Sequence, residues 1–330
     1  MTYHFCSYFD HHYAIRALVM TDSLKAQGFD FKLWVLCLTD ECENILDSVN
    51  YPEIQSVSLH EIETEYPELI RAKDNRSLSE YYFTLSPFWP RWVLENNTTI
   101  GSVIYLDADL EFLSSPQSLI DEGRNCSIGI IEHRFHPTFD IGKHCGRFNV
   151  AWNYFKRDQE ALNCLKKWSE QCLEWCRDYP ENGKFADQKY LDTWPDEFQN
   201  VHILSHPGAN LAPWNLNTHK IEKPNDFLLS DDQRVIFYHF HMIKMLDEEH
   251  ISTSLEIYRV PTELRRKLID WLYFPHITRL LEKESYLSNM GIEAKAFLST
   301  RDFSKIEETH HSEKTLARRL EDGEIIRTKK

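Results

Sequence analysis

The sequence predicts an α/β fold with a mostly parallel central sheet and a C-terminal helical extension. Segments with a strand pattern alternate with segments with a helix pattern over roughly the first 250 residues. The strand segments are continuous apolar runs, which is typical of parallel strands buried on both faces. A chain of 330 residues can hold one large domain with an appendage, or two modest domains. We therefore expect a main domain over residues 1–250 and a helical extension with a charged tail over residues 251–330.

The N-terminal part is expected to form strands and helices in turn. The patterns predict strands over 3–9, 31–38 and 54–62 and helices over 11–28 and 40–49. A polar region over 63–80 follows, and then a helix over 81–97 that Pro87 and Pro90 begin or interrupt.

The middle of the chain is expected to complete the sheet. Strands are predicted over 103–106 and 126–133, and the segment 149–158 is expected to extend the sheet before a long helix over 159–179. A helix start is predicted within 186–194, a proline-bounded loop within 201–216 and a last strand within 234–244. From about Ser252 onward the pattern is helical.

Composition excludes several classes of protein. The net charge of -15 repels nucleic acid and anionic membranes at long range, so we expect no nucleic-acid partner. Glycine is scarce, at 10 residues, which argues against a mechanism built on glycine-rich phosphate loops. The N-terminal residues do not resemble a signal peptide, and no apolar stretch reaches about 18 residues. We therefore expect a cytoplasmic protein.

Two carboxylates follow the apolar run 103–106. Asp107 and Asp109 lie where a buried strand ends, and ligands bind at the carboxyl ends of strands in open α/β sheets. Their side chains point the same way if the strand continues, because side chains alternate along a strand. Two hard oxygen donors suit Mg²⁺ or Mn²⁺, and such an ion could hold an anionic ligand on an acidic protein. The alternative is that one Asp starts a loop and the other caps a turn.

The predicted strand within 234–244 places two histidines on one face. His239 and His241 alternate with Tyr238 and Phe240, so either imidazole could complete a metal site. The alternative is a pair of structural histidines at a strand end. Lys244 follows closely and is expected to contact a phosphate or to lie on the solvated surface.

Several segments, in this order, resemble glycosyltransferases with the GT-A fold, and especially glycosyltransferase family 8 and its bacterial relatives. The Asp-x-Asp strand "VIYLDADLEFLSS" is similar to the metal-binding strand of that family. The other matching segments are "FCSYFDHHYAIRALVMTDSL", "GRFNVAWNYFKRD", "ADQKYLD" and "VIFYHFH". Together they cover about residues 1–245. Residues 239–244 lack the glycine that commonly follows the histidine in the family, and "YFTLSP" replaces its upstream basic residue.

The resemblance implies a GT-A catalytic domain over residues 1–250 that binds a nucleoside-diphospho-sugar, in the first place a UDP-sugar, with Mn²⁺ or Mg²⁺. It implies that His239 is the third metal ligand beside Asp107 and Asp109. The implied donor-binding residues are Tyr8, Asp10, Tyr13, Asp107, Asn149 and Lys244, and the implied catalytic residues facing the donor sugar are Asp187 and Gln188. Asp10 could instead cap the first helix, and Asp187 could cap the helix that follows it.

The implied activity is hexosyl transfer, with retention of configuration, to a saccharide or lipid-linked hydroxyl in glycan or cell-surface polysaccharide synthesis. A basic-aromatic stretch over 261–274 could touch the inner face of a membrane, or it could pack on the main domain. The Trp214 loop within 206–216 could bind sugar, or it could be an ordinary loop. Two other readings stay open. One is a catalytically silent sugar-nucleotide-binding protein, and the other is a sugar-nucleotide nucleotidyltransferase, which would need a glycine-rich basic loop after the first strand.

Overall fold

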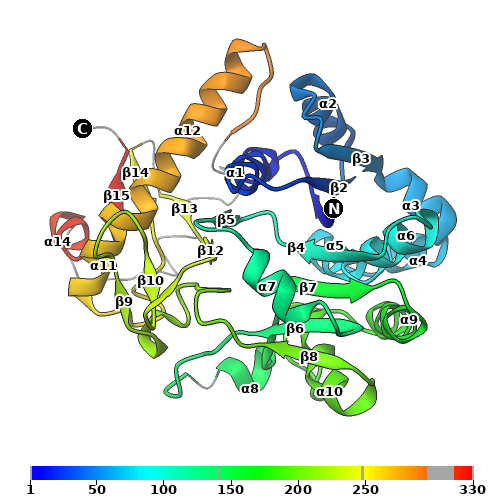
Figure 1. Ribbon diagram of the computed structural model, residues 1–330. Coiled ribbons are helices and arrows are strands. Elements are labelled where there is room, and N and C mark those ends of the chain that lie inside the picture. The colour runs from blue at the N-terminus through cyan, green and yellow to red at the C-terminus, as the bar shows by residue number, and fades with distance from the viewer. Residues whose placement is uncertain (1, 140, 247–248, 296–315, 329–330) are drawn as a thin grey trace.

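The computed structural model describes residues 2–139, 141–246, 249–295 and 316–328. The predicted α/β fold class is confirmed, because a seven-stranded sheet with the order β3-β2-β1-β4-β7-β6-β8 forms the centre of the molecule (Figure 1). Its strands are β1 (Tyr3–Phe9), β2 (Phe31–Cys37), β3 (Ile54–Ser58), β4 (Ser102–Leu106), β6 (Ile128–Glu132), β7 (Phe148–Lys156) and β8 (Val201–Leu204). Within this sheet β7 is antiparallel to β4 and β6, and the other neighbouring strands are parallel.

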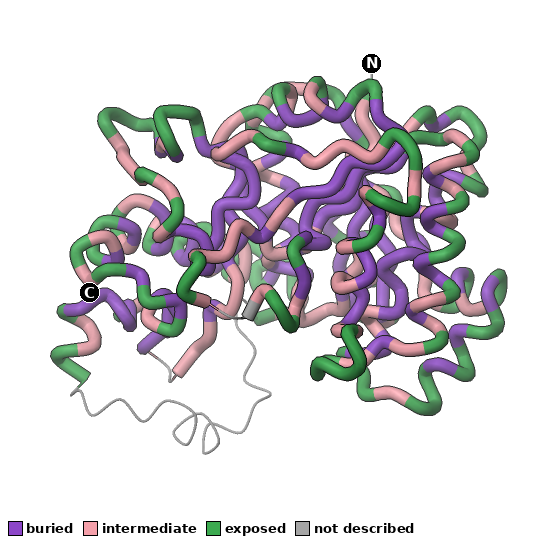
Figure 2. Tube along the Cα trace, turned by 90° about the horizontal axis from the view of Figure 1, so that it is seen from below, coloured by how far each residue is buried: buried purple, intermediate pink, exposed green. Residues whose placement is uncertain are grey.

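Helices cover both faces of the sheet. One face packs against α1 (Ala14–Lys25), α2 (Asp40–Val49) and α7 (Gln117–Gly123), and α12 (Phe274–Asn289) packs on α1. The other face packs against α3 (Leu59–Glu65), α4 (Glu68–Asp74), α5 (Leu78–Leu85), α6 (Phe88–Asn96), α9 (Gln159–Glu174) and α10 (Trp194–Glu197). Figure 2 shows the buried stretches concentrated in the central strands, with the exposed stretches around them. A parallel sheet covered on both faces explains why its strands are continuous apolar runs.

The polar region 63–80 is helical, which the sequence analysis did not predict. Two capping boxes explain the difference: Ser58 with Glu61 begins α3, and Ser77 with Glu80 begins α5. The first box also ends β3 at Ser58, so the expected strand over 54–62 is too long.

The C-terminal extension contains strands as well as helices. Its helices are α11 (Thr262–Leu268), the π-helical turn η3 (Ile269–Tyr273), α12 and α14 (Leu316–Glu321). β14 (His250–Ser252) and β15 (Ile325–Arg327) form an antiparallel sheet with β13 (Lys244–Met245). Residues 296–315 and 329–330 of the expected charged tail lie outside the described residues. Among the described residues we find no helix with the length and apolarity needed to cross a bilayer.

Short elements connect these layers. β5 (Leu110–Phe112) pairs antiparallel with β12 (Phe237–His239) next to the end of β4. The remaining elements are α8 (Ile141–Cys145), η1 (Gln188–Thr193), η2 (Leu216–Thr218), β9 (Ile221–Glu222), β10 (Leu229–Ser230) and β11 (Gln233–Arg234).

Candidate metal centre and its surroundings

Asp107 and Asp109 lie directly beyond the carboxyl end of β4, in the short connection to β5. The backbone N–H of Asp107 donates to the carbonyl of Ala151 at 3.4 Å. The carbonyl of Asp109 accepts the N–H of Phe240 at 3.0 Å. These two hydrogen bonds hold the β4–β5 connection to β7 and to the end of β12. The pairing of β5 with β12 therefore brings His239 to the two carboxylates across a long stretch of sequence.

Asp107, Asp109 and His239 form a compact group. His239 Nε2 lies 3.0 Å from Asp109 Oδ1 and 3.9 Å from Asp107 Oδ2. One ligand atom from each residue lies within 4.8 Å of the other two, and no other group of three or more such side chains exists among the described residues. The side chains of Asp107, Asp109 and His239 are 28%, 15% and 6% exposed, so the group opens to solvent on the Asp107 side.

The charges in this group do not balance. Burial raises the pKa of Asp107 to about 6, and the neighbouring Asp109 adds to the rise while His239 opposes it. Burial also disfavours the charge of Asp109, but His239 holds the pKa of this carboxyl well below its usual range. Despite its own burial, His239 has a raised pKa because of Asp109 and Asp107. Two carboxylates thus share one imidazole, and a cation would relieve the repulsion.

The geometry favours His239 over His241 as the third ligand. His241 is not part of the compact group, and the rings of the two histidines lie 5.9 Å apart. Burial, with the neighbouring His239, lowers the pKa of His241 to about 4. Trp214 packs edge-on against both rings, with centroid distances of 5.1 Å to His239 and 5.2 Å to His241.

Trp214 packs against the site, and its ring is buried rather than exposed for stacking on a ligand. It is only 4% exposed, and its indole Nε1 donates to the carbonyl of His133 at 2.9 Å. Asn215 Nδ2 donates to the same carbonyl at 2.9 Å. The loop within 206–216 therefore supports the histidines, and the suggestion that Trp214 stacks on a sugar is disfavoured by its burial.

Asp187 lies close enough to Asp107 for their charges to interact. Burial raises the pKa of Asp187 to about 7; Ser86 opposes the rise through a hydrogen bond and the charge of Asp107 adds to it. Asp187 precedes η1 but makes no side-chain capping hydrogen bond, which disfavours the capping alternative. Gln188 Nε2 donates to the carbonyl of Cys145 at 2.9 Å, so its amide is tied to α8.

Tyr8, Asp10 and Tyr13 lie around the carboxyl end of β1. The Tyr8 hydroxyl is 2.9 Å from Ser86 Oγ, and its ring lies 5.7 Å from that of Tyr105. Asp10 Oδ1 accepts the N–H of His12 at 3.0 Å, so Asp10 stabilises the turn before α1 rather than capping the helix itself. Burial raises the pKa of Tyr13, with contributions from Asp109 and Asp107, so this ring lies close to the metal-binding group.

Asn149 and Lys244 differ in how they relate to the site. Asn149 is buried on β7; its Oδ1 accepts the N–H of Ala151 at 3.2 Å, and its Nδ2 lies 3.1 Å from His133 Nε2. Its amide is therefore already used inside the protein. Lys244 lies on β13 near His241, whose pKa it helps to lower.

Two residues near the site were not identified from the sequence. Arg16 on α1 stacks on Tyr13, with 4.8 Å between its guanidinium carbon and the ring centroid, and donates to the carbonyl of Ile243 at 3.3 Å. Its charge helps to lower the pKa of Asp109, so it supplies part of the compensating charge. The i, i+3 spacing of Tyr13 and Arg16 on a helix was the available signal. Ser86, between Tyr8 and Asp187, had no such signal.

Comparisons with known proteins add the following. No protein-family model matches the chain. Mouse xyloside xylosyltransferase 1 in its apo form is similar with 14% identity and a TM-score of 0.47, over 73% of this chain and 98% of that protein. The galactosyltransferase LgtC, solved with donor and acceptor sugar analogues, is similar with 16% identity and a TM-score of 0.48, over 73% of this chain and 87% of that protein. These are distant likenesses to glycosyltransferases, the class that the sequence resemblance implied.

Two proteins of Bacillus subtilis (strain 168) are more similar in sequence. The uncharacterized protein YfnD is 30% identical over 282 residues, which cover 84% of this chain and 89% of YfnD. The uncharacterized protein YfnF is 28% identical over 290 residues, which cover 86% of this chain and 95% of YfnF. At this identity and coverage, the chain belongs to the same protein family as YfnD.

Proposed function

We propose that the protein is a metal-dependent glycosyltransferase that moves a hexose from a nucleoside-diphospho-sugar to a hydroxyl acceptor. One observation carries the proposal. At the carboxyl edge of the sheet, Asp107, Asp109 and His239 each place one ligand atom within 4.8 Å of the others, and two of these three groups are carboxylates. Ligands of α/β proteins bind at this edge.

The three side chains fit a hard divalent cation. Two carboxylate oxygens and an imidazole suit Mn²⁺ or Mg²⁺, and a cation would offset both the burial and the neighbouring Asp109 that raise the pKa of Asp107. When bound, such an ion would supply Lewis-acid stabilisation to the departing diphosphate. The three side chains would hold the ion at the end of β4, so that the diphosphate end of the donor could bind there on a chain whose net charge of -15 otherwise repels it.

The residues at the end of β1 suit the nucleoside. In the proposal Tyr8 and Tyr13 border the base and ribose, and the second oxygen of Asp10 accepts an N–H of uracil, which favours a UDP-sugar. Lys244 contacts a phosphate from the β13 side. Asn149 would shape the donor-sugar side of the pocket through His133, because its own amide is already hydrogen-bonded.

Asp187 and Gln188 are the proposed catalytic residues. A carboxylate at Asp187 would stabilise the positive charge that grows at the anomeric carbon, and its proximity to Asp107 supports this placement. The Gln188 side chain would hold the sugar, with its Nε2 anchored on Cys145. The acceptor hydroxyl would attack the same carbon, and we propose retention of configuration from the family resemblance.

The acceptor is proposed to be a saccharide or a lipid-linked sugar in glycan or cell-surface polysaccharide synthesis. Contact of residues 261–274 with a membrane stays a prediction. Within that stretch Arg265 and Tyr273 are buried, and Phe274 is 40% exposed. Phe274 is therefore the residue of this stretch best placed to reach a lipid surface.

The proposal is tested by incubating the purified protein with UDP-glucose or UDP-galactose and Mn²⁺ and measuring the release of UDP. Thermal shift with UDP, with and without Mn²⁺, measures binding separately, because a ligand that binds the native state stabilises it. Cation-dependent release of UDP supports the enzyme. Binding of UDP without release from any common sugar nucleotide supports the silent binding protein instead, and absence of both contradicts the proposal.

A further inference from the structure

The segment between α9 and η1, residues 175–187, leads the chain to Asp187. Two hydrogen bonds fix its end: the N–H of Ala186 donates to the carbonyl of Arg177 at 2.8 Å, and Trp168 Nε1 donates to the carbonyl of Asp187 at 2.8 Å. Ala186 has a φ of +44°, in the left-handed region that residues with a side chain rarely adopt. Such a conformation persists only where surrounding contacts impose it. The backbone just before Asp187 is therefore held in place rather than relaxed.

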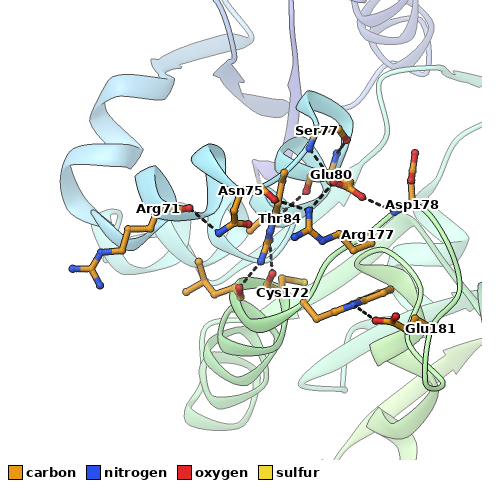
Figure 3. A network of polar contacts seen from close by, with 12 residues as sticks. Arg71, Asn75, Ser77, Glu80, Thr84, Cys172, Arg177, Asp178 and Glu181 are labelled. Carbon is orange, nitrogen blue, oxygen red and sulfur yellow. Dashed lines mark hydrogen bonds and ion pairs between the residues drawn. The ribbon is translucent and has the colours of Figure 1, made fainter.

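Arg177 and Glu80 anchor the start of this turn. Arg177 Nη1 donates to Glu80 Oε2 at 3.0 Å and to the carbonyl of Asn75 at 2.7 Å. The Glu80 carboxylate, which is 6% exposed, also accepts the N–H groups of Ser77 at 2.9 Å and Asp178 at 3.4 Å. Figure 3 shows Glu80 between Ser77 at the start of α5 and the Arg177–Asp178 pair. One buried carboxylate thus joins α5 to both residues where the segment turns.

The same helix meets the site at its other end. α5 ends at Ser86, which hydrogen-bonds Tyr8 and lies against Asp187. The contacts therefore form a closed path from Glu80 through Arg177 and Ala186 to Asp187, and back through Ser86 along α5. Neighbouring Arg76 adds rigidity, because it donates to Thr84 of α5 and to the carbonyls of Cys172 and Leu173 at the end of α9.

We propose that the ion pair between the buried Glu80 and the partly exposed Arg177 positions Asp187 against the group of Asp107, Asp109 and His239, so that Glu80 and Arg177 are positioning residues for the transfer step. This inference rests on the proposed function. The side chains of Arg177 and Glu80 are 27% and 8% exposed. The pair differs from an ordinary structural ion pair because the carbonyl of Arg177 accepts the N–H of Ala186, the left-handed residue that precedes Asp187. Misplacing a reacting group by about an ångström can lower a rate by about 10²-fold, so loosening this anchor should act on turnover.

The experiment compares Arg177→Met, Arg177→Lys and a matched control, Lys184→Met, in the full-length chain. Lys184 pairs with Glu174 at 2.7 Å in the same segment but does not touch α5. We expect Arg177→Met to lower kcat for UDP release from UDP-galactose or UDP-glucose by about tenfold or more, with KM changed by no more than about twofold. Arg177→Lys should recover part of kcat, and Lys184→Met should leave kcat unchanged.

A double-mutant cycle separates positioning from general loss of structure. If Arg177 acts through Asp187, Arg177→Met should lower kcat little further in an Asp187→Asn background. Additive losses, an equal loss of UDP affinity and kcat, or an unchanged kcat for Arg177→Met below its Tm would each overturn the inference.

Amide hydrogen exchange tests the anchor without any activity. In Arg177→Met, exchange should accelerate in residues 177–188 and stay unchanged in residues 102–110, whereas Lys184→Met should not accelerate exchange at residues 186–188. Unchanged exchange at 186–188 in Arg177→Met would also overturn the inference. If the wild-type protein neither binds UDP nor releases it, the proposed function fails, and the exchange experiment still decides whether the pair holds Asp187.

Discussion

Two acids two residues apart each contact a histidine, Asp109 just before β5 and Glu111 on β5, and the two contacts differ in the charges around them. At the first, Asp109 lies 3.0 Å from His239, with Asp107 as a second carboxylate. At the second, Glu111 Oε2 lies 2.5 Å from His276 Nδ1, and Arg279 donates to the other carboxylate oxygen. At the first contact two carboxylates face one imidazole, and Arg16 adds positive charge from nearby; at the second, Arg279 donates directly to the carboxylate.

The difference distinguishes the proposed cation site from a structural pair. Glu111 and His276 are 4% and 2% exposed, and the His276 ring stacks on Phe240 with 3.6 Å between centroids. The protein itself therefore supplies the hydrogen-bond and charge partners of the Glu111 carboxylate. The group around Asp109 is more open on the Asp107 side, where the proposed cation would bind. A histidine beside an acid is thus informative only when all nearby charges are counted.

The strongest test of the comparison removes the unbalanced carboxylates. We expect Asp107→Ala with Asp109→Ala to abolish cation binding measured by calorimetry and to lower UDP release by about 10³-fold or more, because electrostatic stabilisation of the leaving group is lost. The folded state without metal should lose little stability, because removing Asp107, whose charge is disfavoured, offsets the loss of the Asp109–His239 contact. Retained cation affinity in this variant would falsify the assignment of the site.

The second test breaks the balanced pair. Glu111→Gln leaves His276 and Arg279 without their carboxylate, so the free energy of unfolding by urea should fall by about 3 kcal/mol. Cation affinity should stay close to that of the wild type. Glu282→Gln, on the neighbouring α12, is the control and should change the free energy of unfolding by less than about 0.5 kcal/mol. If the Glu111→Gln protein stays folded but loses cation binding, the Glu111–His276 contact is not purely structural, and the comparison fails.

The third test uses the pH dependence of Asp187. A carboxyl whose pKa is raised to about 7 in the folded protein, against about 4 when unfolded, binds more protons in the native state. Stability therefore falls as pH rises from about 4 to about 7. Asp187→Asn should stabilise the metal-free protein by about 2 kcal/mol at pH 8 and by almost nothing below about pH 4. Urea unfolding at several pH values in EDTA measures the difference, and a gain of equal size at pH 4 and pH 8 would contradict the prediction.

The smallest expected effect concerns Met242, which has a φ of +61° between His241 and β13. Glycine adopts this conformation without strain, but it also gives the unfolded chain more conformational entropy. We therefore expect Met242→Gly to raise the free energy of unfolding by a net amount of about 0.5 kcal/mol. Met245→Gly, on β13 itself, should instead lower it by about 1 kcal/mol. A loss of stability in Met242→Gly would show that the side chain matters more than the backbone strain.

Much of this arrangement follows from patterns in the sequence. The apolar run 103–106 predicts β4. Asp107 and Asp109 follow it, and they are expected at the binding edge because ligands of open α/β sheets bind at the carboxyl ends of strands. The alternation of residues 238–241 predicts that His239 and His241 share a face, but not which one reaches Asp109, because that depends on the pairing of β5 with β12.

Other features depend on contacts between distant segments or on single backbone angles. The antiparallel direction of β7 is not encoded in its apolar pattern. The left-handed angles of Ala186 and Met242 run against their residue types, so no propensity predicts them. The helices within 63–80 could have been found, since both capping boxes are visible as a Ser followed three residues later by a Glu.

The β5–β12 pairing has one more consequence. Asp109 and His239 meet only after two strands from opposite halves of the chain have joined, so the proposed cation binding would be thermodynamically linked to tertiary assembly. Mn²⁺ titrated during refolding would then serve as a reporter of this junction, with the bound ion protecting the connection at Asp109 from proteases.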